Sequence, residues 1–263
     1  MKKIILNPSY KSVQKKLNAI PTDFQKEGEL IQGGRNIIKN FEYQGDTYCV
    51  KSFGKPTWAN MFVYSFFRKS KAQRSFEHGM KLLKLGVATP MPIAWIEIKN
   101  SWGIMTESYY ISNYEPGLFD MSHVFFNNDT PDREYIINEF LYFVNHDLHR
   151  QGILHKDFNG GNVLVNRKEN GEYYFSLIDI NRMSFDNHFT QAKAIKNLQG
   201  ITSNTDALIL VARKYAELLH KNFAEILYPL ITTKNIQGKR RFVRKSITNW
   251  LKVHVLHKPV KVH

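Results

Sequence analysis

The chain has 263 residues, of which 43% are hydrophobic and 13% aromatic, a composition typical of a folded globular protein that excludes a disordered one. Its single cysteine, Cys49, excludes an intramolecular disulfide and argues against a cysteine-based metal site. Lys and Arg number 37 against 23 Asp and Glu, and the formal charge of +14 favours an anionic partner such as a nucleic acid, an anionic membrane or a phosphorylated substrate.

Residues 1–27 are interpreted as an extension that precedes the folded lobes. The apolar run after Lys2 and Lys3 stops at Leu6, which is too short for a secretory signal. No segment approaches the length of a membrane-spanning helix. We therefore expect a cytoplasmic protein.

Residues 28–110 are predicted to form a strand-rich first lobe. Turn signals separate its first strands, and the Gly45-Asp46 pair is typical of a hairpin turn. Apolar residues at three- and four-residue spacing then predict an amphipathic helix that ends at Gly86. The expected strands are residues 27–32, 36–43 and 47–53, followed after the helix by two more on either side of a turn at residues 100–101.

Gly33 and Gly34 lie between the first two of these strands. Their backbone amides could reach the phosphates of a nucleotide, and Arg35 and Lys39 would add positive charge there. The full GxGxxG pattern is absent, and a simple hairpin turn explains the two glycines equally well. Both interpretations stay open at this stage.

Residues 111–263 are predicted to form a mainly helical second lobe, joined to the first near residues 107–117. Thr130 as N-cap and Pro131 in the first turn predict a helix that runs to Gly152. The elements expected beyond it are a polar loop, strands at residues 162–166 and 173–180, and helices from about residue 190.

The polar loop, in the stretch ILHKDFNGGNVLV at residues 153–165, has the residue types of a catalytic site. The hairpin formed by the two following strands would bring Asn162 beside Asp179, with Asp157 just outside them. An amide oxygen and a carboxylate are suitable ligands for Mg²⁺. A second carboxylate, free of the metal, can accept a proton from an attacking hydroxyl. The sequence thus predicts a magnesium site at Asn162 and Asp179, with Asp157 as the base.

The compound pattern H-x-D-x-x-x-x-N, then a strand and an Asp, resembles the protein-kinase-like fold, with HKDFNGGN as catalytic loop and IDIN as metal-binding segment. The resemblance implies a bilobal α+β architecture, with an antiparallel-sheet N-lobe that carries one main helix and a mainly helical C-lobe. It implies that Lys51 holds the phosphates of ATP and that Glu77 holds Lys51, although Arg74 is an alternative partner for Glu77. His155 is then expected to brace the loop, and His149 to be a surface or packing residue.

Longer stretches resemble the bacterial lipopolysaccharide kinase family (Kdo/WaaP and InaA-type proteins). The stretches that carry this resemblance are PTWANMFVYSFFRKSKAQRSFEHGMKLLKLGVATPMPIAW, HKDFNGGNVLV and LIDINRM, within about residues 30–215. Lys156 stands where a protein kinase has the Arg of its HRD motif, DIN replaces DFG, and no APE segment follows, so a eukaryotic-type protein kinase is disfavoured.

The family resemblance implies phosphorylation, by ATP and Mg²⁺, of a sugar hydroxyl of Kdo or heptose in the inner core of lipopolysaccharide, or on a lipid A-linked saccharide. It also implies that Glu107 and Tyr109 lie where a hinge would meet adenine through the backbone. Peripheral binding to the anionic inner membrane is expected of two segments that mix aromatic and basic residues, at residues 58–71 and 238–263, although these aromatics could equally belong to the core.

Three rival functions fit the sequence less well. An aminoglycoside-type phosphotransferase would need an acidic cleft for cationic drugs, which a charge of +14 disfavours. A pseudokinase scaffold would normally lack a catalytic residue, whereas all five positions are filled here. A nucleic-acid-binding module would fit the charge, but no base-reading motif is present, so no nucleic-acid partner is expected.

Overall fold

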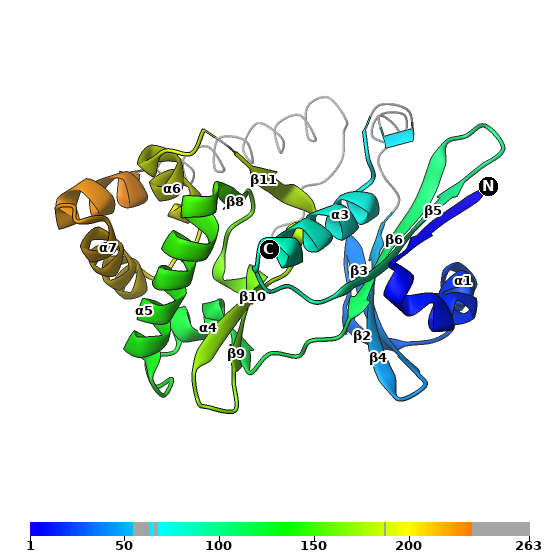
Figure 1. Ribbon diagram of the computed structural model, residues 1–263, viewed down its shortest axis with the longest axis horizontal. Coiled ribbons are helices and arrows are strands. Elements are labelled where there is room, and N and C mark those ends of the chain that lie inside the picture. Colours follow the sequence, from blue (N-terminus) through cyan, green and yellow to red (C-terminus); the bar gives the residue numbers. More distant parts are fainter. Residues whose placement is uncertain (55–60, 62–63, 66–67, 187, 233–263) are drawn as a thin grey trace, which may run out of the picture.

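The computed structural model describes residues 1–54, 61, 64–65, 68–186 and 188–232, and these residues form two lobes (Figure 1). In the described part, the N-lobe is a six-stranded antiparallel sheet and the C-lobe is mainly helical, with two small sheets of its own. The predicted bilobal α+β fold is confirmed.

The N-lobe sheet has the strand order β1-β5-β6-β4-β3-β2. The strands at residues 29–32, 36–43 and 46–53 coincide closely with the predicted segments. Gly45 at φ +86° closes the turn between the last two, which are runs of β-favouring residues. The strands are β1 (Lys2–Leu6), β2 (Glu29–Gln32), β3 (Asn36–Tyr43), β4 (Asp46–Phe53), β5 (Pro92–Lys99) and β6 (Met105–Asn113).

The two faces of this sheet have different partners, since side chains alternate along each strand. On one face Val50 of β4 packs with residues of helix α1 (Gln14–Asp23). On the other face Phe53 packs with Ala72 of helix α3 (Lys71–Lys84). Figure 1 shows α1 and α3 on opposite sides of the sheet. Lys51, two residues before Phe53, therefore lies on the α3 side.

Residues 1–27 belong to the N-lobe, so their interpretation as a separate extension was wrong. Strand β1 is an edge strand of the sheet and pairs with β5 from Lys2 to Leu6. Leu17 and Ile20 of α1 are buried against the sheet. These two apolar residues three positions apart give the short helix one hydrophobic side, a pattern too brief to recognise in the sequence.

Helix α3 is positioned by its cap and by one buried stripe. The side chain of Ser70 accepts a hydrogen bond from the backbone N–H of Gln73, and Gly86 follows the helix at φ +78°. The buried stripe that packs beneath the helix consists of Ala72, Ser75, Gly79 and Leu82. This stripe sets which helix residues can face the cleft between the lobes.

The C-lobe packs its helices around one hydrophobic core beside two short sheets. The helices are α4 (Met121–Phe126), α5 (Arg133–Phe143), α6 (Gln191–Leu198) and α7 (Thr205–Leu219). The strands are β7 (Phe119–Asp120), β8 (Ile153–His155), β9 (Val163–Arg167), β10 (Tyr173–Leu177) and β11 (Met183–Phe185).

The start of helix α5 differs from the prediction that Thr130 caps it. Asp132 adopts the left-handed conformation at φ 57°, and the helix begins only after it, at Arg133. The Thr130 hydroxyl instead donates to the carbonyl of Asn127. A loop turn thus uses the Thr and Pro that would otherwise start the helix.

Among the residues that the structure describes, no helix combines the length and the apolar character that crossing a bilayer requires. The aromatic residues on which the expected membrane surface depended, Trp58, Phe62, Phe66, Phe67 and Trp250, lie outside the described residues.

Candidate active site

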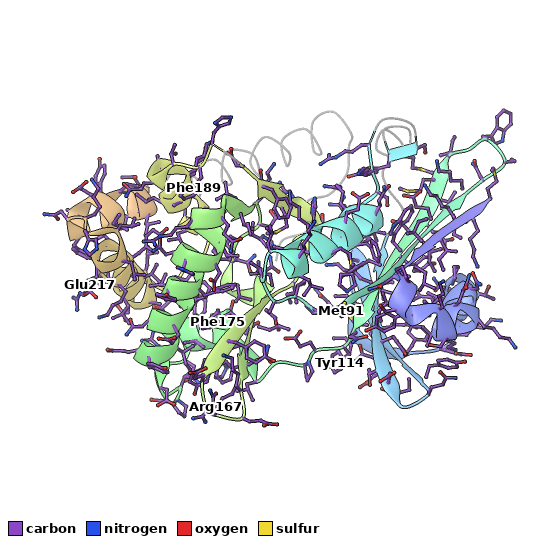
Figure 2. The ribbon with its side chains drawn as sticks, in the orientation of Figure 1. Met91, Tyr114, Arg167, Phe175, Phe189 and Glu217 are labelled. Carbon is purple, nitrogen blue, oxygen red and sulfur yellow. The ribbon has the colours of Figure 1, made fainter. Side chains whose placement is uncertain are left out.

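A cleft of about 430 Å³ lies between the two lobes. Its N-lobe wall comes from β2, β3 and β4, its C-lobe wall from the catalytic loop and the end of β10, and its back from the connection after β6. Figure 2 labels Tyr114 in this connection. The described lining residues include Ile31, Ile38, Cys49, Lys51, Tyr114, Glu115, Asn162, Leu164 and Asp179.

The expected hairpin places Asn162 and Asp179 side by side. Val163 at the start of β9 pairs with Leu177 at the end of β10, and the backbone N–H of Ile178 donates to the Asn162 carbonyl at 3.0 Å. The Asn162 side-chain amide donates to the backbone carbonyl of Asp157 at 2.8 Å. Because its NH₂ group is used in this way, the Asn162 side-chain oxygen stays available to a cation.

Asp179 is held by an ion pair across the cleft. It adopts the left-handed conformation at φ 52°, and its Oδ1 accepts hydrogen bonds from Lys51 Nζ at 2.7 Å and from the Asn181 amide at 2.6 Å. Burial acts to raise the pKa of Asp179, but the charge and hydrogen bond of Lys51 and the Asn181 amide outweigh burial and lower this pKa below its ordinary value. Asp179 is therefore a carboxylate at neutral pH.

Asp157 lies beside the cleft-lining Asn162, which bonds its backbone carbonyl, and its side chain is paired with an arginine that the sequence did not single out. Arg182 Nη1 donates to Asp157 Oδ1 at 2.6 Å. Strand β11 pairs with β8, and Lys156 N–H donates to the Arg182 carbonyl at 2.9 Å, which fixes the two side chains on adjacent strand ends. An Arg just after the IDIN segment was the only sequence signal for this contact.

His155 braces the catalytic loop, as expected. It is fully buried, its Nδ1 accepts from the N–H of Asp157 at 3.2 Å, and its Nε2 donates to the Ile178 carbonyl at 3.1 Å. Burial lowers the pKa of His155, which keeps the ring neutral with one acceptor and one donor nitrogen. The same ring thereby joins the loop of Asp157 to the strand end that precedes Asp179.

The expected pair of Lys51 with Glu77 is not formed. Glu77 instead accepts hydrogen bonds from Lys69 at 2.8 Å and from Gln73 at 2.9 Å. An α-helix turns by roughly 100° per residue, so Glu77 lies away from the buried stripe of α3, on its solvent side. The alternative partner, Arg74, donates to the backbone carbonyl of Asn181.

The hinge lies later in the chain than predicted. Glu107 and Tyr109 are inside strand β6, which continues to Asn113, so the boundary between the lobes falls after residue 110 as well. Tyr109 is fully buried on the α1 face, with its ring 5.3 Å from that of Phe24, and its hydroxyl bonds Glu107. Both side chains therefore point away from the cleft.

The connection that lines the cleft is residues 113–116. Glu115 ties it to the C-lobe, because its Oε1 accepts hydrogen bonds from Asn166 at 2.7 Å and from Ser176 at 2.5 Å. These two partners lie on β9 and β10, the strands that carry Asn162 and lead to Asp179. Glu115 therefore positions the connection relative to the catalytic hairpin.

Gly33 and Gly34 form the turn between β2 and β3, at the edge of the cleft. Gly34 has φ +116°, a conformation that favours glycine, and a Cβ added at either glycine would meet no other atom within 4 Å. The flanking residues Ile31 and Ile38 line the cleft. The hairpin turn is therefore present, and its two glycines have open space around them rather than a packed neighbour.

A buried hydrogen-bond chain supports the catalytic loop from behind. The Tyr215 hydroxyl of α7 donates to His149 Nδ1 at 2.6 Å, and His149 Nε2 donates to the Asn197 side-chain oxygen at 3.2 Å. The Asn197 amide then donates to the backbone carbonyl of His155 at 2.8 Å. His149 is fully buried, and burial lowers its pKa to about 4.

Because it includes a buried neutral histidine, this hydrogen-bond chain makes the free energy of unfolding depend on pH. The unfolded His149 binds a proton near its ordinary pKa of 6.5, whereas the folded one does so only at about 4. Its contribution is therefore complete above pH 6.5 and is lost as the pH falls from 6.5 to 4, by roughly 3 kcal/mol in total. Denaturant unfolding at pH 7, 5.5 and 4.5 should show that the free energy of unfolding falls more steeply for the native protein than for His149→Gln, whose side chain has one acceptor and one donor group but cannot ionise. Equal slopes would contradict this role.

Comparison with known proteins agrees with this geometry. The model of the lipopolysaccharide kinase (Kdo/WaaP) family matches residues 27–221. No curated protein matches the chain. Among solved structures, the chain is similar to WaaP in complex with acyl carrier protein, with 16% identity, a TM-score of 0.59, and coverage of 90% of this chain and 98% of that one.

Two further solved structures have lower TM-scores with this chain. The Rio2 kinase–ADP/Mg²⁺-phosphoaspartate complex from Chaetomium thermophilum has 14% identity and a TM-score of 0.48 over 87% of this chain and 77% of that one. The MAP kinase LmaMPK10 from Leishmania major has 15% identity and a TM-score of 0.40 over 77% and 60%. The family model covers most of the chain, including the catalytic loop and the segment of Asp179. The chain belongs to the lipopolysaccharide kinase (Kdo/WaaP) family.

Proposed function

We propose that this protein transfers the γ-phosphate of ATP to a sugar hydroxyl, on Kdo or heptose, in the inner core of lipopolysaccharide. The observation that carries the proposal is the cleft between the lobes, into which Lys51, Asn162 and Asp179 converge beside Asp157 in a member of a lipopolysaccharide kinase family. An acceptor attached to lipid A would be met at the cytoplasmic face of the inner membrane, which the charge of +14 supports.

The cleft has suitable walls for a nucleotide. Ile38 from the N-lobe and Leu164 from the C-lobe are apolar lining residues that can hold an adenine ring between them, next to the connection at residues 113–116. Lys51, farther along the same wall, would bind the α- and β-phosphates. In this proposal Gly33 and Gly34 cover the phosphates through their backbone amides, while Glu107 and Tyr109 have no part in nucleotide binding.

The donor groups fit magnesium. Asn162 offers a side-chain oxygen, because its NH₂ group is already bonded to the Asp157 carbonyl, and Asp179 offers a carboxylate that is ionised at neutral pH. One carboxylate, one amide oxygen and the phosphates of a nucleotide are a usual ligand set for Mg²⁺, which retains water at its other positions. When bound, the metal would neutralise charge on the β- and γ-phosphates.

In this proposal Asp157 orients the acceptor. Arg182 occupies Oδ1, which leaves Oδ2 for the sugar hydroxyl, and the His155 ring and the Asn162 amide fix the backbone on either side of this carboxylate. Asp157 would accept the hydroxyl proton as the sugar oxygen attacks phosphorus, and the leaving group would be ADP.

The proposal is tested by phosphate transfer from ATP labelled at the γ-position. The purified protein and Mg²⁺ would be incubated with lipid A bearing Kdo only, and with a core that bears both Kdo and heptose. Mass spectrometry should find one added phosphate on one of these acceptors, and the fragment that carries it identifies the sugar. Magnesium-dependent ATP binding without transfer to either acceptor would favour a pseudokinase and overturn the proposed reaction.

A further inference from the structure

Helix α3 presents a cation, rather than an acid, toward the catalytic lysine. The ε-amino groups of Lys71 and Lys51 lie 5.6 Å and 5.5 Å from the centre of the same Phe53 ring. Phe53 is buried at the end of β4, directly under the first turn of the helix. The two lysines, from different elements, are therefore neighbours around one aromatic side chain.

Lys71 has no anionic partner of its own. Lys51 is bonded to Asp179 and Lys69 to Glu77, but the Lys71 ammonium makes no hydrogen bond or ion pair with any residue that the structure describes. It is nevertheless half-buried. A half-buried ammonium without such a partner is costly unless a ligand supplies the negative charge.

A third cation approaches from the glycine hairpin. Arg35 follows Gly34 in the turn between β2 and β3, and it lines a small pocket together with Lys71, Phe53 and Gly54. Gly54 has no room for a side chain, since a Cβ there would lie 2.3 Å from the Arg35 carbonyl oxygen. This close approach fixes the hairpin turn against the end of β4, so that the Arg35 and Lys71 side chains share one pocket.

The electrostatics of Lys71 agree with this arrangement. Burial and the nearby charge of Arg35 lower the pKa of Lys71. The charges of Lys51 and Arg74 lower it further, and the charge of Asp179 raises it. Positive charge is thus concentrated between the hairpin, the first turn of α3 and the carboxylate of the expected metal site. Phosphate groups carry the opposite charge and accept several hydrogen bonds.

We propose that Lys71 and Arg35 bind the β- and γ-phosphates of the nucleotide and form, together with Lys51, a three-cation cradle for its phosphate chain, in which Lys71 rather than the expected Glu77 is the α3 residue that acts beside Lys51. The inference rests on the proposed use of ATP. It assigns the two flanking cations, which line the small pocket beside Phe53 and not the cleft itself, to the phosphate tail. It therefore predicts that they distinguish ATP and ADP from AMP.

The test is equilibrium binding of ATP and ADP, each with Mg²⁺, and of AMP to the full chain by calorimetry. Lys71→Gln should weaken binding of ATP and ADP roughly tenfold, the size expected for one charge-assisted contact, and leave AMP within about twofold. Lys84→Gln, the same charge change on an exposed residue of the same helix, should alter none of them. Arg35→Gln should weaken ATP and spare AMP. Melting temperatures would verify that each variant is folded.

A charge-reversal variant of Lys71 distinguishes the proposed cradle from the usual kinase arrangement, in which a helix glutamate pairs with the strand lysine. Lys71→Glu would place an acid opposite Lys51, so retained or improved ATP binding would overturn the cradle, whereas a loss larger than that of Lys71→Gln supports it. An equal loss of ATP and AMP affinity in Lys71→Gln, or no loss at all, would also overturn it. If the native chain itself bound no ATP, the proposed function would fail instead, which keeps the two failures distinguishable.

Discussion

Replacing Asp157 by Asn should lower the rate of phosphate transfer about 1000-fold while Mg²⁺–ATP binding stays within about twofold. The amide keeps the shape of the carboxylate but cannot accept the proton of the acceptor hydroxyl, and positioned general bases are worth roughly 10² to 10⁴ in rate. It also removes the charge that pairs with Arg182 at 2.6 Å. The measurements are single-turnover transfer to the lipid-linked acceptor and calorimetric ATP binding.

The matched control for this substitution is Asp129→Asn, on the exposed loop before α5, which should transfer phosphate at the native rate. If Asp157→Asn were as active as this control, Asp157 would not be the base. A loss of ATP binding equal to the loss of transfer would show a collapsed loop instead, since the Asp157 backbone also holds Asn162.

Replacing Asp179 by Asn should remove the effect of magnesium on nucleotide binding and reduce transfer by roughly 10² to 10³, because metal stabilisation of phosphoryl oxygens is worth several kcal/mol. The native chain should bind ATP more tightly with Mg²⁺ than with EDTA. The variant should show little difference between the two conditions, since the carboxylate that is ionised beside Lys51 is gone.

ADP titrations with and without Mg²⁺ measure this directly, and AMP serves as an internal reference because its binding should depend little on the metal. A native-like magnesium effect in Asp179→Asn would remove Asp179 from the metal site. The same titrations on Asn162→Ala would then show whether the amide oxygen contributes independently.

Elements whose shape is dictated by local chemistry could be predicted from the sequence. The strands β3 and β4, the Gly45 turn, and the hairpin that joins β9 to β10 follow from alternating residues and from glycines at positive φ. Because that hairpin has a fixed register, the neighbourhood of Asn162 and Asp179 could be predicted without a structure.

Side-chain directions could not be predicted from the sequence where the orientation of an element depends on its packing partners. Tyr109 and Tyr110 are adjacent on β6, yet one faces α1 and the other faces the cleft, and only the contacts of the whole sheet decide which. Glu77 has the expected place in the chain order, but the buried stripe of α3 rotates it toward solvent. A helix or strand can therefore be predicted correctly while the residue that faces the site is predicted wrongly.

Contacts between distant segments were missed for a similar reason. Arg182 meets Asp157 because β8 and β11 pair, and each of these strands has only three residues, which leaves almost no pattern to read. The residues of α1 reach the sheet through a first strand that the sequence did not reveal. The Arg182–Asp157 contact and the packing of α1 both depend on strand pairs that form only when the lobe is assembled.

The hydrogen-bond chain from Tyr215 through His149 and Asn197 to the loop has a consequence for biosynthesis. His149 and Tyr215 are 66 positions apart, and Tyr215 lies in the last turns of α7. A ribosome that has translated every catalytic residue has therefore not yet released the side chain that supports them from behind. We therefore expect the loop to reach its final form only after α7 has emerged and docked, so that a nascent chain that still lacks this helix would not consume ATP.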